Sequence, residues 1–114
     1  IQAAAAQFLG SLGDRRAVEP LLRALVRGNN ASSLVWIVQA LGKLQDQRAV
    51  EPLLALVQTT DSASVRYTAI EALGRLGDTR AISIIRRYAN DDSHHVRARV
   101  VAALEQLTPA RHIG

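Results

Sequence analysis

The sequence predicts an all-α fold, an α-solenoid of about seven helices wound into a right-handed superhelix, and three observations lead to this prediction. The phrase "LGDRRAVEPLL" at 12–22 returns as "LQDQRAVEPLL" at 44–54 and, more loosely, as "LGDTRAISII" at 76–85. Apolar residues within each copy recur at spacings of three and four, as in an amphipathic helix. No stretch shows the sustained alternation of a β-strand.

The repeat period is 31–32 residues, and each period contains two apolar segments. Equivalent residues of the three copies are separated by 32 positions. A second phrase precedes each copy as "AQFLGSLG", "VQALGKLQ" and "IEALGRLG", and it occurs a fourth time as "VAALEQLT", displaced by 31. A pair of short helices fits one period, and such pairs bury their apolar faces only by stacking on their neighbours.

The first helix of each pair is predicted four times. Val65, Ala69 and Leu73 illustrate the apolar stripe that defines it. Ser62 and Ser93 each follow an aspartate and are suited to cap the helix N-terminus. The predicted ranges are 2–12, 32–44, 62–76 and 93–107.

The second helix of each pair is predicted three times. Val18, Leu21 and Leu25 give its apolar stripe in the first copy. Pro20 and Pro52 fit in the first helical turn, where a missing N–H costs least, so residues 14–17 are expected to form a preliminary turn. The predicted ranges are 16–27, 48–58 and 80–89.

The domain organisation is expected to be a single array over residues 1–107, with about 3.5 repeats and a tail at 108–114. The sequence begins at Ile1, in mid-repeat, so we expect a fragment of a longer solenoid whose uncapped ends could self-associate. No apolar run approaches the ~18 residues of a membrane span, and a cytoplasmic location is expected.

The segments "VRYTAIEALGRLGDTRAISII" at 65–85 and "VRARVVAALEQL" at 96–107 resemble the HEAT-like repeats first named from phycobilisome lyase subunits. The resemblance covers nearly the whole chain. It implies a protein-binding scaffold, with bilin lyases and regulatory subunits as other members, and it places the first helix of each pair on the concave surface. Family members usually open that helix with Val-Arg, whereas the second copy has Ser33-Leu34.

Residues that recur in every copy have a role that every repeat requires, so we interpret them as structural. An aspartate between the helices can accept backbone N–H bonds and pair with an arginine of its own or the next repeat. Stacked helix pairs stand about 10 Å apart, too far for the ligands of one metal ion. The predicted structural ladder consists of Asp14, Asp46, Asp78, Arg16, Arg48 and Arg80.

Residues that change between copies are the candidates for partner binding. Trp36, the only tryptophan, and Tyr67 have the composition of a protein-interface hot spot. The alternative is that Trp36 packs between repeats in place of the arginine missing at Leu34. The predicted partner-binding residues on the concave face are Val35, Trp36, Gln39, Lys43, Tyr67, Thr68, Glu71, Arg75, His95 and Arg99.

The sequence indicates no enzymatic chemistry, and we predict no cofactor and no metal. The chain has no cysteine, nucleophile–base pair or phosphate loop, and the adjacent His94 and His95 point in different directions on a helix. The leading hypothesis is a non-enzymatic protein interaction scaffold. The alternatives are a subunit of a bilin lyase or related tetrapyrrole-handling complex and a nucleic-acid-binding module. Nucleic acid is disfavoured because few of the fourteen basic residues lie on the variable stripe.

Overall fold

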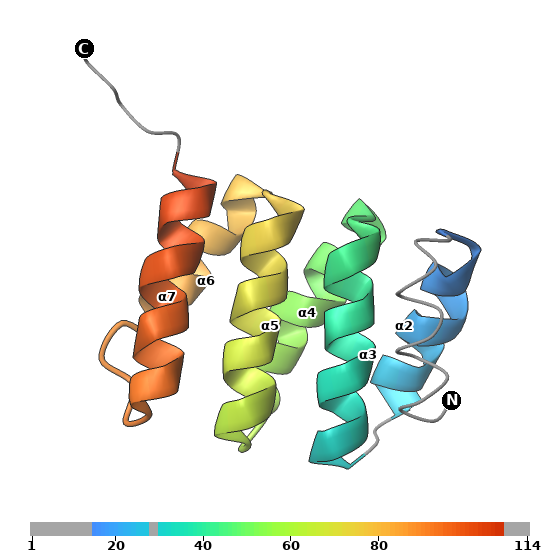
Figure 1. The fold of residues 1–114 in the computed structure, drawn as a ribbon, viewed down its shortest axis with the longest axis horizontal. Coiled ribbons are helices and arrows are strands. Elements are labelled where there is room, and N and C mark those ends of the chain that lie inside the picture. The colour runs from blue at the N-terminus through green and yellow to red at the C-terminus, as the bar shows by residue number, and fades with distance from the viewer. Residues whose placement is uncertain (1–14, 28–29, 109–114) are drawn as a thin grey trace.

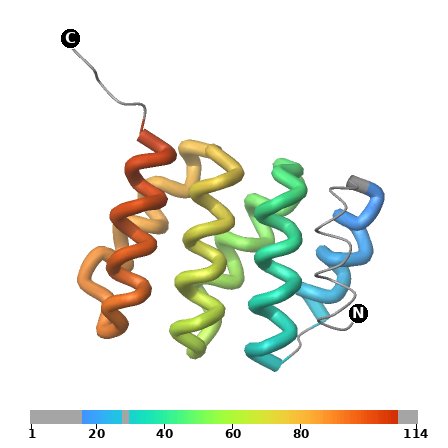
Figure 2. Tube along the Cα trace, viewed as in Figure 1, coloured from blue at the N-terminus to red at the C-terminus, as the bar shows by residue number. Residues whose placement is uncertain are grey.

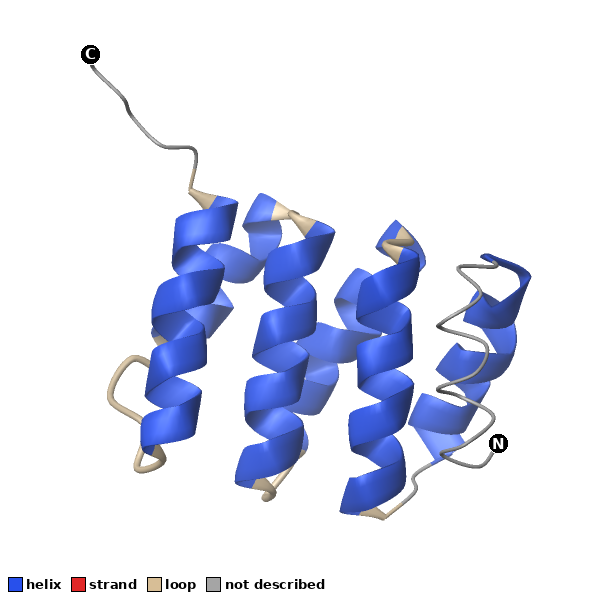
Figure 3. Ribbon diagram, in the orientation of Figure 1, coloured by secondary structure: helices blue, strands red, loops and turns tan. Residues whose placement is uncertain are grey.

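The computed structural model describes residues 15–27 and 30–108 as helices joined by short turns, with no strand in this part of the chain (Figure 3). The described residues form six α-helices in two layers, and the chain is an α-solenoid, as predicted (Figure 1). The predicted helix at 2–12, Asp14 and tail residues 109–114 lie outside the described residues. The front layer holds α3 (Ala31–Leu44), α5 (Ala63–Leu76) and α7 (His94–Leu107), and the back layer holds α2 (Val18–Arg27), α4 (Val50–Thr59) and α6 (Ile82–Arg86).

A short 3-10 turn precedes each back helix. These turns are η1 (Arg15–Ala17), η2 (Gln47–Ala49) and η3 (Thr79–Ala81). The turn expected before the first back helix is therefore confirmed. Each back helix begins two residues later than predicted, which puts Pro20 and Pro52 at the third helical position, where no N–H is needed within the helix.

The last back helix is shorter than the predicted range 80–89, because its hydrogen-bond pattern changes. The N–H of Arg87 bonds to the carbonyl of Ile84 at 3.1 Å, and that of Ala89 bonds to Arg86 at 3.2 Å. These three-residue turns tighten the backbone and end α6 at Arg86. The chain reaches α7 one residue sooner after the start of α5 than it reaches α5 after the start of α3, in agreement with the displacement of 31 residues.

The front helices begin at polar caps. The hydroxyl oxygens of Ser62 and Ser93 accept hydrogen bonds from the N–H groups three residues later, at 3.3 and 3.4 Å. Both predicted caps are thus confirmed. In α3 the cap is Asn30, which accepts from Ser33 at 2.9 Å, so this helix begins one residue before the predicted start.

The front helices run side by side in the same direction and pack directly on one another (Figure 2). Glycines permit the close approach: a Cβ atom on Gly74 would lie 3.1 Å from the Cα and Cβ atoms of Ala103 in α7. Gly42 meets Ala72 of α5 in the same way, also at 3.1 Å. Successive back helices contact each other far less. The closer packing of the front layer favours curvature toward that side.

The hydrophobic core fills the space between the two layers. Its largest side chains are aliphatic, and they come from both front and back helices, so each layer is held by the other. No described helix has the length and apolar character needed to cross a bilayer. The largest fully buried residues include Leu21, Ile37, Leu41, Leu53, Ile70, Leu73 and Ile85.

The C-terminal caps of α3 and α5 have the same left-handed backbone but different residues. Gly77 follows α5 with φ 71° and ψ 16°. Gln45 follows α3 with φ 53° and ψ 38°, and among the described residues it is the only non-glycine residue with positive φ. A side chain in this region of backbone space is strained, so the second repeat carries a local strain that the third repeat lacks.

Candidate functional site

The turn before each back helix joins successive repeats. The carboxylate of Asp46 accepts hydrogen bonds from the backbone N–H of Arg48 at 2.9 Å, from its Nε at 3.0 Å and from its Nη2 at 2.8 Å. The Nη1 atom of the same arginine donates to Glu19 of the preceding repeat at 2.9 Å. One guanidinium group therefore connects the turn of its own repeat with the back helix of the repeat before it.

The next repeat has the same arrangement. Arg80 donates to Asp78 through its backbone N–H, Nε and Nη2, and its Nη1 donates to Glu51 of the preceding repeat at 3.1 Å. The hydrogen bonds from Arg80 hold the pKa of Asp78 below its ordinary value, and Asp78 in turn raises the pKa of Arg80. The Arg48 guanidinium has its pKa raised by Asp46 in the same way.

The two glutamates were missed from sequence, although Glu19 and Glu51 occupy equivalent positions 32 residues apart. The recurrence of glutamate at equivalent positions was the sequence signal that could have identified them as part of the ladder. Arg16 is exposed in η1, and its predicted partner Asp14 lies outside the described residues. Because Arg48 and Arg80 are at least half exposed, solvent screens their ion pairs with the glutamates, and each pair contributes little to stability.

The arginine of each Val-Arg pair is hydrogen-bonded to the loop that precedes its front helix. Arg66 donates to the carbonyl of Thr60 at 3.1 Å, and Arg97 donates to the carbonyl of Asp91 at 2.6 Å, six residues back in both cases. Arg66 also pairs with the Asp91 carboxylate at 3.3 Å, in a partly buried setting. Leu34 stands at this position in α3 and packs against the core instead.

An aromatic hollow lies between the N-terminal halves of α3 and α5. Val35 and Trp36 line it from α3, and Tyr67 and Ser64 line it from α5. Trp36 is 36% exposed, whereas the neighbouring Leu34 packs against the core. The indole is therefore partly in solvent beside the phenol ring of the next repeat.

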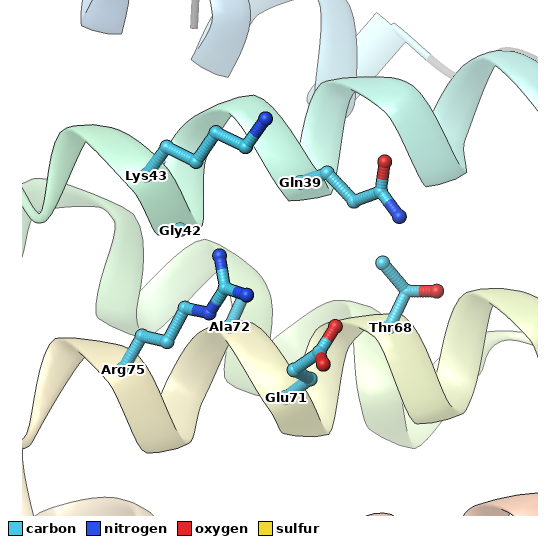
Figure 4. A pocket seen from close by; sticks show the side chains of 7 residues that line it. All are labelled: Gln39, Gly42, Lys43, Thr68, Glu71, Ala72 and Arg75. Carbon is cyan, nitrogen blue, oxygen red and sulfur yellow. The ribbon is translucent and has the colours of Figure 1, made fainter. Parts of the chain in front are cut away.

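A polar hollow lies toward the C-terminal halves of α3 and α5, next to the aromatic hollow along the same two helices, and we call the two hollows together the groove between α3 and α5 (Figure 4). Gln39 and Lys43 face it from α3, and Glu71 and Arg75 face it from α5. Thr68 also borders the hollow but is only 3% exposed, and its hydroxyl donates to the carbonyl of Ser64 at 2.7 Å. Thr68, one of the residues predicted for partner binding, therefore offers little surface to a partner, and its hydroxyl is already bonded within its own helix.

A third hollow lies between α5 and α7 and shares Glu71 and Arg75 with the polar hollow. Arg99 connects it to the aromatic residues, because its guanidinium carbon lies 5.5 Å from the centre of the Tyr67 ring. The Nε atom of Arg99 is 3.6 Å from the Glu71 carboxylate, an ion-pair contact that is too long for a hydrogen bond. His95 lies beside Tyr67 with ring centres 5.7 Å apart.

The three hollows form one surface over α3, α5 and α7, which we call the front surface. All ten residues predicted for partner binding border these hollows or, in the case of His95, contact a residue that does. The residues predicted for partner binding do not include Ala102 and Glu105, which line the α5–α7 hollow three and six residues after Arg99. Within 15–27 and 30–108, no three histidine, aspartate or glutamate residues are grouped so as to hold a metal ion.

Two family models, both of helical repeats, match the chain. The family model described as HEAT repeats matches residues 29–105. The model described as PBS lyase HEAT-like repeat matches residues 1–27. A search of curated proteins found no match.

Proposed function

The chain belongs to the HEAT repeat family, and on that premise we propose that it is a non-enzymatic scaffold that binds another protein through its front surface. HEAT repeats generally mediate protein interactions, and families built from them are typically non-catalytic. The second match, to the PBS lyase HEAT-like repeat, names a kind of repeat and not a reaction.

The observation that carries the proposal is the partly exposed Trp36 beside Tyr67. Tryptophan, tyrosine and arginine dominate the binding energy of protein interfaces, because they bury large areas and can also form hydrogen bonds. Here Arg99 lies against the Tyr67 ring, so all three residue types meet on one surface. Trp36 is 36% exposed, so its burial by a partner would add hydrophobic stabilisation to the complex.

The hollows of the front surface are open depressions that can accept single side chains of a partner protein. The two between α3 and α5 have volumes of about 150 and 280 Å³, and the one between α5 and α7 has about 460 Å³.

The test is to replace Trp36 and Tyr67 by alanine, alone and together. A partner is first isolated by affinity capture on the 114-residue chain, and its affinity for each variant is then measured by calorimetry. We expect each single change to weaken binding at least about tenfold, as for a hot-spot residue. The helical circular dichroism signal should stay unchanged, because both side chains are partly exposed.

The matched control is Val26→Ala, which truncates an exposed apolar residue on the back helix α2. This variant should bind the partner as the unmodified chain does. Equal affinity of the partner for the double variant and the unmodified chain would refute the proposed surface.

A further inference from the structure

We propose that the front surface recognises an acidic segment that carries an apolar anchor residue, bound along the groove between α3 and α5. This inference rests on the proposed function and specifies the chemistry of its partner. The apolar anchor occupies the aromatic hollow of Val35, Trp36 and Tyr67, and one or more carboxylates lie over Lys43 and Arg75 in the polar hollow.

The charge of the polar hollow favours an anionic ligand. Lys43 and Arg75 are both exposed, and neither has a carboxylate within ion-pair distance among the described residues. They come from equivalent positions of adjacent front helices, and both line the polar hollow (Figure 4). Two cations in one shallow hollow repel each other, and a carboxylate placed between them would remove that repulsion.

Glu71 is the one acidic residue that lines the polar hollow, and Arg99 of α7 already offsets its negative charge. Its carboxylate lies 3.6 Å from Arg99, which reaches across from α7. The remaining acid of the front surface, Glu105, lines the α5–α7 hollow and not the groove between α3 and α5. The positive charge of Lys43 and Arg75 therefore stays uncompensated along that groove.

The two hollows also define a spacing within the ligand. Trp36 and Lys43 are seven residues apart on α3, which corresponds to about 10 Å along the helix axis at ~1.5 Å per residue. An extended peptide covers about 10 Å with three residues. The preferred segment therefore has an aspartate or glutamate about three residues from a leucine, isoleucine or aromatic residue.

The experiment is a selection of random twelve-residue peptides displayed on phage, using the 114-residue chain as the target. A parallel selection uses the charge-reversed variant Lys43→Glu/Arg75→Glu. A matched control, Arg23→Glu/Arg27→Glu on the back helix α2, changes the net charge equally but away from the groove. Dye-labelled synthetic versions of the enriched peptides are then titrated by fluorescence anisotropy, because Trp36 is the only tryptophan and its alanine variant would lack an intrinsic signal.

We expect the unmodified chain and the α2 control to enrich peptides with an acidic residue about three positions from an apolar one. Changing the acidic residues of such a peptide to their amides should weaken its binding at least about tenfold, and higher salt should weaken it further. The charge-reversed variant should lose the acidic peptides and select peptides with lysine or arginine instead.

Two outcomes overturn the inference in distinguishable ways. Enriched peptides whose binding requires Trp36 and Tyr67, but which are neutral or basic or ignore the Lys43→Glu/Arg75→Glu change, would refute the acidic ligand and leave the proposed surface intact. Failure to enrich any peptide, or binding that is insensitive to alanine at Trp36 and Tyr67, would refute the proposed surface together with the inference.

Discussion

Replacing Gln45 by glycine should stabilise the protein, because Gln45 adopts the left-handed backbone conformation that Gly77 adopts one repeat later. Gln45 and Gly77 are the C-caps of the equivalent front helices α3 and α5, so the two residues can be compared directly in one backbone conformation. The strain at Gln45 is local to its backbone. Nothing lies within 4 Å of a Cβ atom built on Gly77, so the equivalent site has open space around it.

The magnitude follows from three contributions. A non-glycine residue in this conformation costs about 1 to 2 kcal/mol, which the change removes. Glycine loses more backbone entropy on folding, at a cost of roughly 0.5 to 1 kcal/mol. The hydrogen bond from Gln45 to the carbonyl of Arg75 is long, at 3.4 Å, and exposed, so its loss matters little. The difference is a net gain in the free energy of unfolding of about 0.75 kcal/mol, within a range of about 0 to 1.5 kcal/mol.

The assay is thermal and urea unfolding followed by circular dichroism. For a chain of this size the gain corresponds to an increase in Tm of about 2 to 4 °C. The reciprocal change Gly77→Ala should lower stability by a similar amount, since it introduces the strain without a steric clash. A loss of stability in Gln45→Gly, or a gain in Gly77→Ala, would show that the backbone argument is wrong.

Three further predictions concern the contacts between repeats. Asp78→Asn should lower the free energy of unfolding at pH 7 and have progressively less effect as the pH falls below about 4, because the folded state lowers the pKa of Asp78 and its stabilisation is lost on protonation. Arg66→Ala should cost about 1 to 3 kcal/mol in urea unfolding, because Asp91 then keeps a partly buried charge without its ion-pair partner. Gly74→Leu should cost about 1 to 3 kcal/mol in the same assay, because the side chain would force α5 and α7 apart.

Each of these predictions has a matched control in the chain. Asp61→Asn removes the same charge at an exposed position and should stay within about 0.5 kcal/mol of the unmodified protein. Arg86→Ala removes an exposed arginine from α6 and should stay within about 0.5 kcal/mol of the unmodified protein. Ala55→Leu adds a leucine side chain at an exposed position of α4 and should stay within about 0.5 kcal/mol of the unmodified protein. A pH-independent effect of Asp78→Asn, or full stability in Arg66→Ala or Gly74→Leu, would contradict the corresponding contact.

The sequence by itself determined the helical repeat, its period and most of its local structure. Val65, Ala69 and Leu73 revealed a helix, and Ser62 and Ser93 its N-terminal caps, because these signals depend on residues within one or two turns of each other. The short turn before the first back helix was predictable for the same reason. The early end of α6 was not predictable, because it depends on a local change of hydrogen bonding that no repeated residue indicates.

Only the tertiary structure decided how the repeats meet. The bonds from Arg48 to Glu19 and from Arg80 to Glu51 join residues 29 positions apart, a separation set by the stacking of the helix pairs. Stacking likewise buried Thr68 and put Trp36 beside Tyr67. The variable residues were visible in the sequence, but their grouping into one surface depends on how closely glycine and alanine allow neighbouring front helices to approach, which is a property of packing and not of periodicity.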